Sequence, residues 1–147
     1  LRVNFNATRF DKQANKLFAN DALDDVNGTV TNPKWTGNLD VNFTSKDWTF
    51  YWGLDYIGGT DSYAYYGLDP ATSTYKFDTP AYFTHNVSVK FKDPVQKWDV
   101  VVGLRNVTDT KPPMISSGAY SRVGNALLYS GYDFMGRTLF VNLNKTF

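Results

Sequence analysis

The side chains that most often carry catalysis or bind metals are scarce in this sequence. His85 is the only histidine, there is no cysteine, and most carboxylates stand singly. Neither a Ser-His-Asp triad nor a pair of catalytic carboxylates can be assembled from them. The acidic residues Asp21, Asp24 and Asp25 lack the Asp-x-Asp-x-Asp-Gly spacing of a Ca²⁺ loop and fit a solvated loop better. We therefore expect no catalytic residue, no metal site and no cofactor.

Tyrosines gathered in one polar segment are the best candidates for contact with a ligand. Residues 60–78 are rich in Tyr, Gly, Asp and Ser, as expected of a long loop. Exposed aromatic rings can stack on a sugar or on a chelate of the catecholate type. The alternative is that these rings pack only against one another. The candidate ligand contacts are Tyr63, Tyr65, Tyr66 and Tyr75.

Asparagine stands two residues before Ser or Thr at six places, which matches the acceptor sequence for N-glycosylation. Strand geometry offers a simpler interpretation, because residues i and i+2 share one face of a strand. The pairs Asn6/Thr8, Asn42/Thr44, Asn86/Ser88 and Asn144/Thr146 then place two polar side chains together. Such a face would suit a wet lumen. The candidate lumen-facing residues are Asn38, Asp40, Asn42, Asn86, Asn142 and Asn144.

Composition limits the class of protein without indicating a partner. Of the 147 residues, 42% are hydrophobic and 20% are charged, which excludes gross disorder. The net charge of +1 gives no reason to expect nucleic-acid binding. No run approaches the ~18 apolar residues of a membrane-spanning helix. The strands of a membrane β-barrel remain compatible with the mean hydropathy of −0.39, because they alternate between lipid and water.

Six segments alternate apolar and polar residues with the period of two that is typical of β-strands. Short turns and long polar loops alternate between these segments, and a short helical turn is expected within residues 12–22. The expected strands cover residues 1–10, 35–44, 48–57, 82–91, 98–105 and 136–147. This pattern predicts an all-β fold.

The alternation of short turns with long loops is the asymmetry of outer-membrane β-barrels, whose periplasmic turns are short and extracellular loops long. Aromatic residues should then mark both membrane interfaces on the apolar face. The expected aromatic girdle consists of Phe43, Trp48, Phe91 and Trp98 beside the short turns and of Trp35, Tyr56 and Phe83 at the other rim. The predicted fold is therefore an antiparallel transmembrane β-barrel segment of about six strands.

The last twelve residues, from Gly136, form a strand with two clearly different faces. Its apolar face carries Leu139, Val141, Leu143 and Phe147, whereas the other face is mostly polar. A terminal strand that ends in an aromatic residue resembles the signal that the barrel-assembly machinery of outer-membrane proteins reads by strand addition. These four residues are the candidate assembly signal.

Two short motifs carry a family resemblance. Residues 104–113 read Leu-Arg-Asn-Val-Thr-Asp-Thr-Lys-Pro-Pro, and residues 132–137 read Tyr-Asp-Phe-Met-Gly-Arg. They resemble the C-terminal end of TonB-dependent outer-membrane receptors, which runs roughly Asn-Leu-Phe-Asp-Lys-x-Pro-Pro, then Tyr-Asp-x-x-Gly-Arg, then the closing strand. Val107 and Thr108 replace the usual Leu-Phe pair, so the first motif matches loosely and the second closely. The rhythm of hairpins and loops extends the resemblance over essentially the whole chain.

The resemblance implies a receptor in the outer membrane of a Gram-negative bacterium that takes up a scarce nutrient such as a siderophore, cobalamin or a saccharide. Such receptors have a barrel of ~22 strands filled by a plug domain, and the TonB complex acts on the plug. Six strands cannot enclose a plugged lumen, and open sheet edges in lipid are costly. We expect residues 1–147 to be the C-terminal strands of a larger barrel, with the plug outside this chain.

The expected partners are the plug and remaining strands of the same receptor, the TonB complex acting through the plug, the barrel-assembly machinery, outer-membrane lipid and a small nutrient. Three alternatives make different predictions. A small outer-membrane barrel with a structural or adhesive role would form a stable oligomer of this chain alone. A soluble β-sandwich lectin would use the tyrosine loop and need no detergent. An outer-membrane enzyme is disfavoured by the missing catalytic groups.

Overall fold

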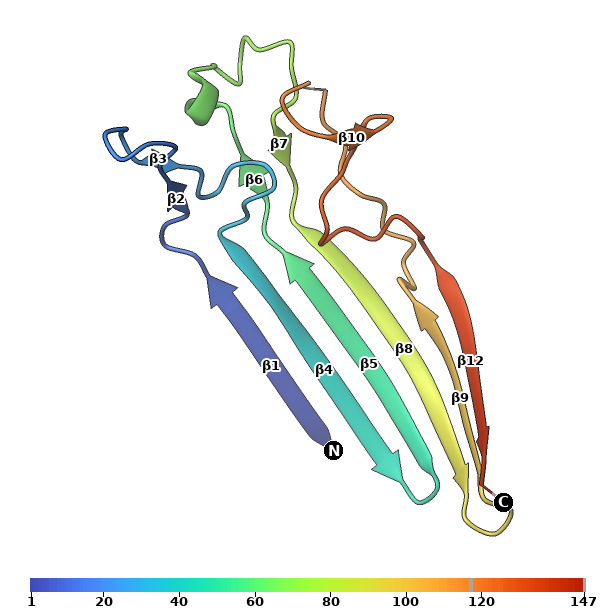
Figure 1. Ribbon diagram of the computed structural model, residues 1–147. Coiled ribbons are helices and arrows are strands. Elements are labelled where there is room, and N and C mark those ends of the chain that lie inside the picture. The colour runs from blue at the N-terminus through green and yellow to red at the C-terminus, as the bar shows by residue number, and fades with distance from the viewer. Residues whose placement is uncertain (117, 147) are drawn as a thin grey trace.

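The computed structural model describes residues 1–116 and 118–146, and it consists of one long antiparallel sheet with loops gathered at one end (Figure 1). The six long strands are neighbours in chain order, from β1 at one edge to β12 at the other. The strands are β1 (Arg2–Arg9), β4 (Trp35–Ser45), β5 (Trp48–Ile57), β8 (Tyr82–Asp93), β9 (Trp98–Arg105) and β12 (Thr138–Lys145). The predicted all-β, six-stranded antiparallel architecture is confirmed.

The register of the strands aligns side chains of one kind into rows that cross the whole sheet. One row on the apolar face consists of Val3, Val41, Trp52, Val87, Leu104 and Leu139. The neighbouring row on the opposite face is mainly polar in β1 to β8 and contains Arg2, Asn42, Tyr51, Ser88, Gly103 and Phe140. A shift of any strand by one residue would exchange these faces, so the alternation in the sequence fixes the register.

Short connections and long loops lie at opposite ends of the sheet (Figure 1). Residues 46–47 join β4 to β5, and residues 94–97 join β8 to β9. At the other end are loop 1 (residues 10–34), loop 2 (residues 58–81) and loop 3 (residues 106–137), which together form the loop cap. The cap contains β2 (Ala14–Asn15), β3 (Asp24–Asp25), β6 (Thr60–Asp61), the 3₁₀ turn η1 (Ala64–Tyr66), β7 (Asp78–Thr79), β10 (Arg122–Val123) and β11 (Ala126–Leu127).

The helical turn expected within residues 12–22 is wrong. Part of this segment instead forms β2, which pairs with β3 in an antiparallel register that sets Ala14 opposite Asp25. The Asp25 carboxylate accepts hydrogen bonds from the backbone amides of Gln13 and Asn27 at 3.2 and 3.1 Å. Short polar side chains that bond nearby backbone groups compete with helix formation, and here they support the hairpin.

The buried core of the described structure lies at the loop end. Val30 and Leu127 have no exposed surface, and Ile115 is 2% exposed. By contrast, Phe5 and Leu139 on the apolar face of the sheet are 71% and 66% exposed. The core cluster consists of Val30, Ile57, Tyr82, Ile115, Leu127 and Tyr132. Loop 1, loop 3 and the loop-side ends of β5 and β8 contribute to this core, so these two loops are packed together against the end of the sheet.

Hydrogen bonds between the loops reinforce this packing. The backbone amide of Val30 in loop 1 donates to Ser62 Oγ in loop 2 at 2.8 Å. The same hydroxyl lies 2.9 Å from the hydroxyl of Tyr120 in loop 3. Lys76 and Ser116 form a further link between loops 2 and 3 through the backbone amide of Lys76. One buried serine therefore joins all three loops.

Candidate functional site

Polar residues from neighbouring strands form a hydrogen-bonded ladder on one face of the sheet. Asn6 Nδ2 donates to Asn38 Oδ1 at 3.3 Å, and Asn38 Nδ2 donates to Asp40 Oδ2 at 2.9 Å. Tyr51 completes the ladder by donating its hydroxyl to Asp40 Oδ1 at 2.7 Å. The Tyr51 side chain lies across Gly53, where a Cβ would meet the tyrosine oxygen at 2.2 Å. The amide and carboxylate groups are therefore held in fixed orientations.

A second polar group on the same face is centred on Asp55. Its Oδ2 accepts hydrogen bonds from Asn86 Nδ2 at 2.9 Å and from Thr84 Oγ1 at 3.4 Å. Asn86 Oδ1 in turn accepts a hydrogen bond from the backbone amide of Asn106 at 3.0 Å. This chain of contacts connects the polar face to the base of loop 3.

The other predicted lumen-facing residues lie on this polar face as well. The register sets Asn42 opposite Tyr51, Asn142 opposite Val101 and Asn144 opposite Asp99. Near the short connections, Asp99 also forms an ion pair with Lys90 at 3.3 Å. That this face borders a lumen stays a prediction.

A groove of about 760 Å³ lies between the loop end of the polar face and loop 3. Hydroxyl, amide and charged residues of the sheet form one wall, and residues 129–133 contribute tyrosine rings from loop 3. The polar lining from the sheet includes Asn6, Thr8, Thr36, Asn38, Asp55, Thr84, Asn86 and Arg105. The groove thus combines fixed hydrogen-bonding groups with aromatic rings, the combination that suits a small polar ligand.

Three of the four candidate tyrosines of loop 2 pack around Phe77, Tyr65 packs against Tyr66, and the four differ in exposure. Tyr63 is 9% exposed, and its hydroxyl donates to the carbonyl oxygen of Tyr75 at 3.0 Å. Tyr65 and Tyr66 are each 42% exposed, and Tyr75 is 56% exposed. The rings of Tyr66 and Tyr75 lie 5.1 and 6.1 Å from that of Phe77. Three rings are open to a ligand while Tyr63 supports them, and ligand contact stays a prediction.

The pKa values of Tyr65 and Tyr66 are both raised by their surroundings. The Tyr65 hydroxyl donates to Asp24 Oδ2 at 2.9 Å, and this bond to a carboxylate raises the pKa of Tyr65. Burial raises the pKa of Tyr66 to about 12, and hydrogen bonding with Tyr120 adds to the effect. Both phenols are therefore neutral donors at pH 7, suited to stacking and hydrogen bonding.

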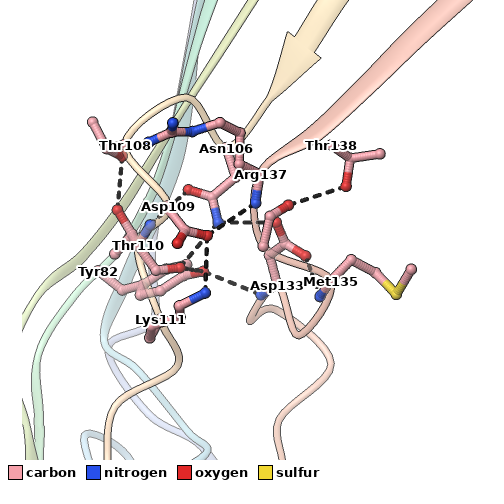
Figure 2. Close-up of polar contacts among 11 residues, drawn as sticks. Tyr82, Asn106, Thr108, Asp109, Thr110, Lys111, Asp133, Met135, Arg137 and Thr138 are labelled. Atoms are coloured by element: carbon pink, nitrogen blue, oxygen red, sulfur yellow. Dashed lines mark hydrogen bonds and ion pairs between the residues drawn. The ribbon is translucent and has the colours of Figure 1, made fainter.

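The two sequence motifs at the C-terminal end meet in a single hydrogen-bonded cluster, shown in Figure 2. Asn106, at the end of β9, is 1% exposed and donates through Nδ2 to Thr110 O and Asp133 Oδ2, both at 3.0 Å. Its Oδ1 accepts the Thr110 amide at 2.9 Å. The backbone amide of Asp133 donates to the Tyr82 hydroxyl at 3.1 Å. Asn106 therefore ties the start of loop 3 to its end.

Asp109 makes the second connection between the motifs. Its Oδ1 accepts the backbone amide of Arg137 at 3.0 Å and the Lys111 ammonium at 2.9 Å. Lys111 foremost, and then the Arg137 amide, lower the pKa of Asp109. Gly136 has φ +71°, and a Cβ there would lie 2.7 Å from Asp109 Oδ1. We call Asn106, Asp109, Asp133 and Arg137 the base clamp, because together they hold β9 and β12 at the foot of loop 3.

The predicted aromatic residues beside the short turns gather on the apolar face. The rings of Trp48 and Phe91 lie 4.7 Å apart, and Phe43 packs against Phe50 at 6.3 Å. At the same end the Lys145 ammonium lies 4.6 Å from the centre of the Trp98 ring. These contacts form an aromatic band along the short-turn end of the sheet.

A second aromatic band crosses the apolar face near the loop cap. The Arg9 guanidinium lies 5.6 Å from the centre of the Trp35 ring, and Tyr56 packs against Phe83 at 5.0 Å. The predicted members of the outer rim, Trp35, Tyr56 and Phe83, thus belong to this band. Their role at a membrane interface stays a prediction.

The three described residues of the candidate assembly signal lie on the same apolar face. Leu139, Val141 and Leu143 are 66%, 60% and 60% exposed on β12, the edge strand of the sheet. Phe147 lies outside the residues that the structure describes. The assembly role of this strand is not tested by its position and stays a prediction.

Sequence reasoning missed the aromatic side chains that lie across glycines on the polar face. Gly103 lies opposite Phe140, and a Cβ at Gly103 would lie 2.4 Å from the Phe140 ring. The Arg105 guanidinium then covers that ring at 5.4 Å from its centre. A glycine in a polar-face position, directly opposite an aromatic residue, was the available signal.

These observations together define the class of protein. An antiparallel sheet with one apolar face between two aromatic bands, one mainly polar face, short turns at one end and long loops at the other is a section of an outer-membrane β-barrel. The family model described as "TonB dependent receptor-like, beta-barrel" matches residues 1–107. The chain therefore belongs to this family, whose members are transport proteins of the bacterial outer membrane and not enzymes. Its open sheet is part of a larger barrel.

The other comparisons add no relative. Neither the curated proteins nor the solved structures contain a significant match to the chain. Within residues 1–116 and 118–146, no helix is long and apolar enough to span a membrane. Over the same residues, no group of three or more His, Cys, Asp or Glu side chains is placed to hold a metal ion.

Proposed function

We propose that this chain supplies the C-terminal strands of a TonB-dependent receptor that takes up a scarce nutrient, and that the nutrient is recognised at the loop end of its polar face. The observation that carries this proposal is the packed loop cap, which holds exposed tyrosines and a polar groove at the same end of the sheet. A rigid cap reduces the entropy lost when a ligand binds. Tyr65, Tyr66 and Tyr75 are the proposed ligand contacts, and buried Tyr63 supports them.

The polar face borders the lumen in this proposal and faces a plug domain supplied by another part of the receptor. Its ladder of amides and carboxylates offers hydrogen bonds to a plug, to water or to passing cargo. The TonB complex acts through that plug. The apolar face with its two aromatic bands contacts outer-membrane lipid in this proposal, and Leu139, Val141 and Leu143 of β12 serve, with Phe147 of the sequence, as the signal for the barrel-assembly machinery.

Siderophore, cobalamin and saccharide remain the candidate cargoes. Neutral phenols stack on catecholate rings and on sugar faces alike. The fixed donors and acceptors of the groove favour a cargo with several hydroxyl or amide groups. The proposal commits to recognition by these tyrosines, whichever cargo binds.

Binding to the whole receptor tests the proposal, with a ferric catecholate complex, cyanocobalamin and a malto-oligosaccharide as probes. Replacing Tyr65 and Tyr66 together by alanine should weaken binding of the recognised probe by roughly tenfold, as expected for two lost aromatic contacts. Phe134→Ala is the matched control, because Phe134 is also an exposed ring of the cap at 41% but lies in loop 3. Equal affinities for the double variant and the control would contradict the role of the tyrosines.

The mass of the native polypeptide tests the proposed domain arrangement. A receptor with a plug should give a denatured mass several times the 16.6 kDa of this chain. A denatured mass near 16.6 kDa, together with a stable oligomer in detergent, would replace the receptor proposal by the small oligomeric barrel.

A further inference from the structure

Asp24 in loop 1 and Tyr65 in loop 2 meet at the surface of the loop cap, although they lie 41 positions apart in the chain. The Tyr65 hydroxyl is 2.9 Å from Asp24 Oδ2. Asp24 is exposed, and the pairing of β3 with β2 fixes its backbone opposite Asn15. Tyr65 is 42% exposed. The contact thus places an exposed carboxylate directly beside one of the exposed rings of the cap.

The direction of this hydrogen bond determines what the two side chains can offer to a ligand. A carboxylate has no proton to donate, so Tyr65 is the donor and its phenol oxygen keeps its capacity to accept. Within residues 1–116 and 118–146, no group donates a hydrogen bond to Asp24 Oδ1. Asp24 Oδ1 and Tyr65 Oη are therefore two neighbouring acceptors, and the pair has no donor left to offer.

The two acceptors lie at the edge of an aromatic surface. Tyr66 packs edge-to-face against Tyr65, with 5.0 Å between the ring centres and an interplanar angle of 88°. Tyr66 is itself packed against Phe77 at 5.1 Å and against Tyr120 at 6.3 Å. Because Tyr66 is still 42% exposed, its ring is held in position by the cap and remains open to a ligand.

A ligand that matches this surface must bring hydrogen-bond donors and an apolar face together. A sugar ring meets both requirements, because its neighbouring hydroxyls supply adjacent donors and its C–H groups can cover an aromatic ring. A ferric catecholate complex instead brings negative charge and oxygen acceptors, which the Asp24 carboxylate repels. The carboxylate thus distinguishes between cargoes that the tyrosine rings alone would not.

We propose that Asp24 and Tyr65 accept hydrogen bonds from neighbouring hydroxyls of a neutral carbohydrate cargo, whose C–H face contacts the Tyr66 ring. Asp24 is then a specificity-determining residue, because its charge favours a neutral, hydroxyl-rich cargo over an anionic chelate. Hydrogen bonds to a charged acceptor are stronger than those to a neutral one, so the carboxylate contributes more than an amide would. This inference rests on the proposed function, since it adds a residue and a cargo class to the same tyrosines.

Binding to the whole receptor in detergent tests the proposal, with a panel of neutral malto-, xylo-, cello- and chito-oligosaccharides and a ferric catecholate complex as probes. At least one oligosaccharide should bind, and its fully O-methylated form, which lacks hydroxyl donors, should bind far more weakly. Asp24→Ala should weaken oligosaccharide binding by about tenfold, the effect of one lost charge-assisted hydrogen bond. Asp11→Ala is the matched control, because Asp11 is another exposed carboxylate of loop 1 that pairs with Arg9, and it should leave binding unchanged.

Asp24→Asn separates a role in binding from a role in folding. The amide keeps the shape of the side chain and an oxygen that can accept the Tyr65 hydroxyl, but it removes the charge. It should weaken oligosaccharide binding and reduce the discrimination against the ferric catecholate, each by about threefold. A merely structural role would not shift the preference between the two probes. Thermal unfolding of each variant in detergent verifies that it is folded.

The proposal would be overturned if no oligosaccharide of the panel bound, or if the O-methylated form bound as tightly as the free sugar. Equal oligosaccharide binding by the Asp24→Ala and Asp11→Ala variants would overturn it as well. If that result came with a loss of affinity when Tyr65 and Tyr66 are both replaced by alanine, only the role of Asp24 would be wrong. If the double tyrosine variant also bound normally, the proposed function itself would fail.

Discussion

The sheet and the loop cap of this chain are stabilised in opposite ways. In the sheet, large apolar residues such as Phe5 and Leu139 remain exposed, and the strands are joined by backbone pairing. In the cap, Val30 and Leu127 are fully buried, and side-chain hydrogen bonds join the loops. The difference follows from the solvent on each side. Lipid covers an apolar sheet face without a packed core, whereas loops in water must bury their own apolar groups.

The largest expected effect tests whether the cap stabilises itself. Leu127→Ala removes a fully buried side chain and should destabilise the cap by about 2–5 kcal/mol. The neighbouring change Leu128→Ala, at a residue that is 50% exposed, should have little effect. Hydrogen exchange should show faster exchange across the three loops and unchanged protection in β4, β5 and β8. Equal loss of protection in the strands would mean that cap and sheet unfold together.

The next test exploits the apolar face of the sheet. Val141→Arg places a charge in the middle of β12 on the lipid side and should cost about 2–4 kcal/mol in folding into lipid vesicles. Asn142→Arg places the same charge one residue further along the strand, on the polar face, and should be nearly neutral. Refolding of the whole receptor into vesicles, monitored by denaturant titration, compares the two. If both variants lost the same folding stability, the apolar and polar faces of β12 would not contact different solvents.

The base clamp connects the two regions, and breaking it should uncouple them. Asn106→Ala removes a buried amide that holds both Thr110 and Asp133, with an expected cost of about 1–3 kcal/mol. Thr108→Ala is the control on the same turn. Protease cleavage within loop 3 should become faster only in the Asn106 variant, while β9 and β12 remain paired. An unchanged rate of cleavage in the Asn106 variant would show that the clamp does not hold loop 3 in place.

The smallest effect is a pH dependence of the same clamp. Lys111 and the Arg137 amide lower the pKa of Asp109, so its stabilising contribution is complete above the pKa of the unfolded chain and is lost as pH falls through the lower, folded value. The clamp should therefore be intact at neutral pH and loosen in acid. Hydrogen exchange around Arg137, corrected for the intrinsic pH dependence of exchange, measures this, and Asp109→Asn should abolish the pH dependence.

The sheet was predictable from the sequence because a period of two leaves few alternatives. A residue such as Val41 has apolar neighbours at every second position, and the predicted strand bounds agree with the observed ones to within two residues. The polar face was predicted for the same reason, including Asn38 and Asp40. Local alternation contains this information, so no knowledge of distant contacts was needed.

The loop cap was less predictable, because its structure depends on contacts between segments far apart in the chain. Nothing near Tyr63 in the sequence distinguishes it from Tyr65, yet one is buried and the other exposed. The two motifs that form the clamp are visible in the sequence as short local patterns. The hydrogen bond from Asn106 to Asp133 is not, because it joins residues 27 positions apart. The need for a glycine at position 37 likewise depends on the approach of the Asn6 carbonyl from another strand.

The position of Ser62 limits how this receptor surface can diversify. Because its hydroxyl contacts both the Val30 amide and the Tyr120 hydroxyl, each loop is adapted to the other two. A single loop taken from a related protein would not fit the other two loops of this chain. All three loops would have to be exchanged together. If the tyrosines contact the nutrient as proposed, new specificity would be acquired most readily at outward positions such as Tyr65 and Tyr75, where the framework of the cap stays unchanged.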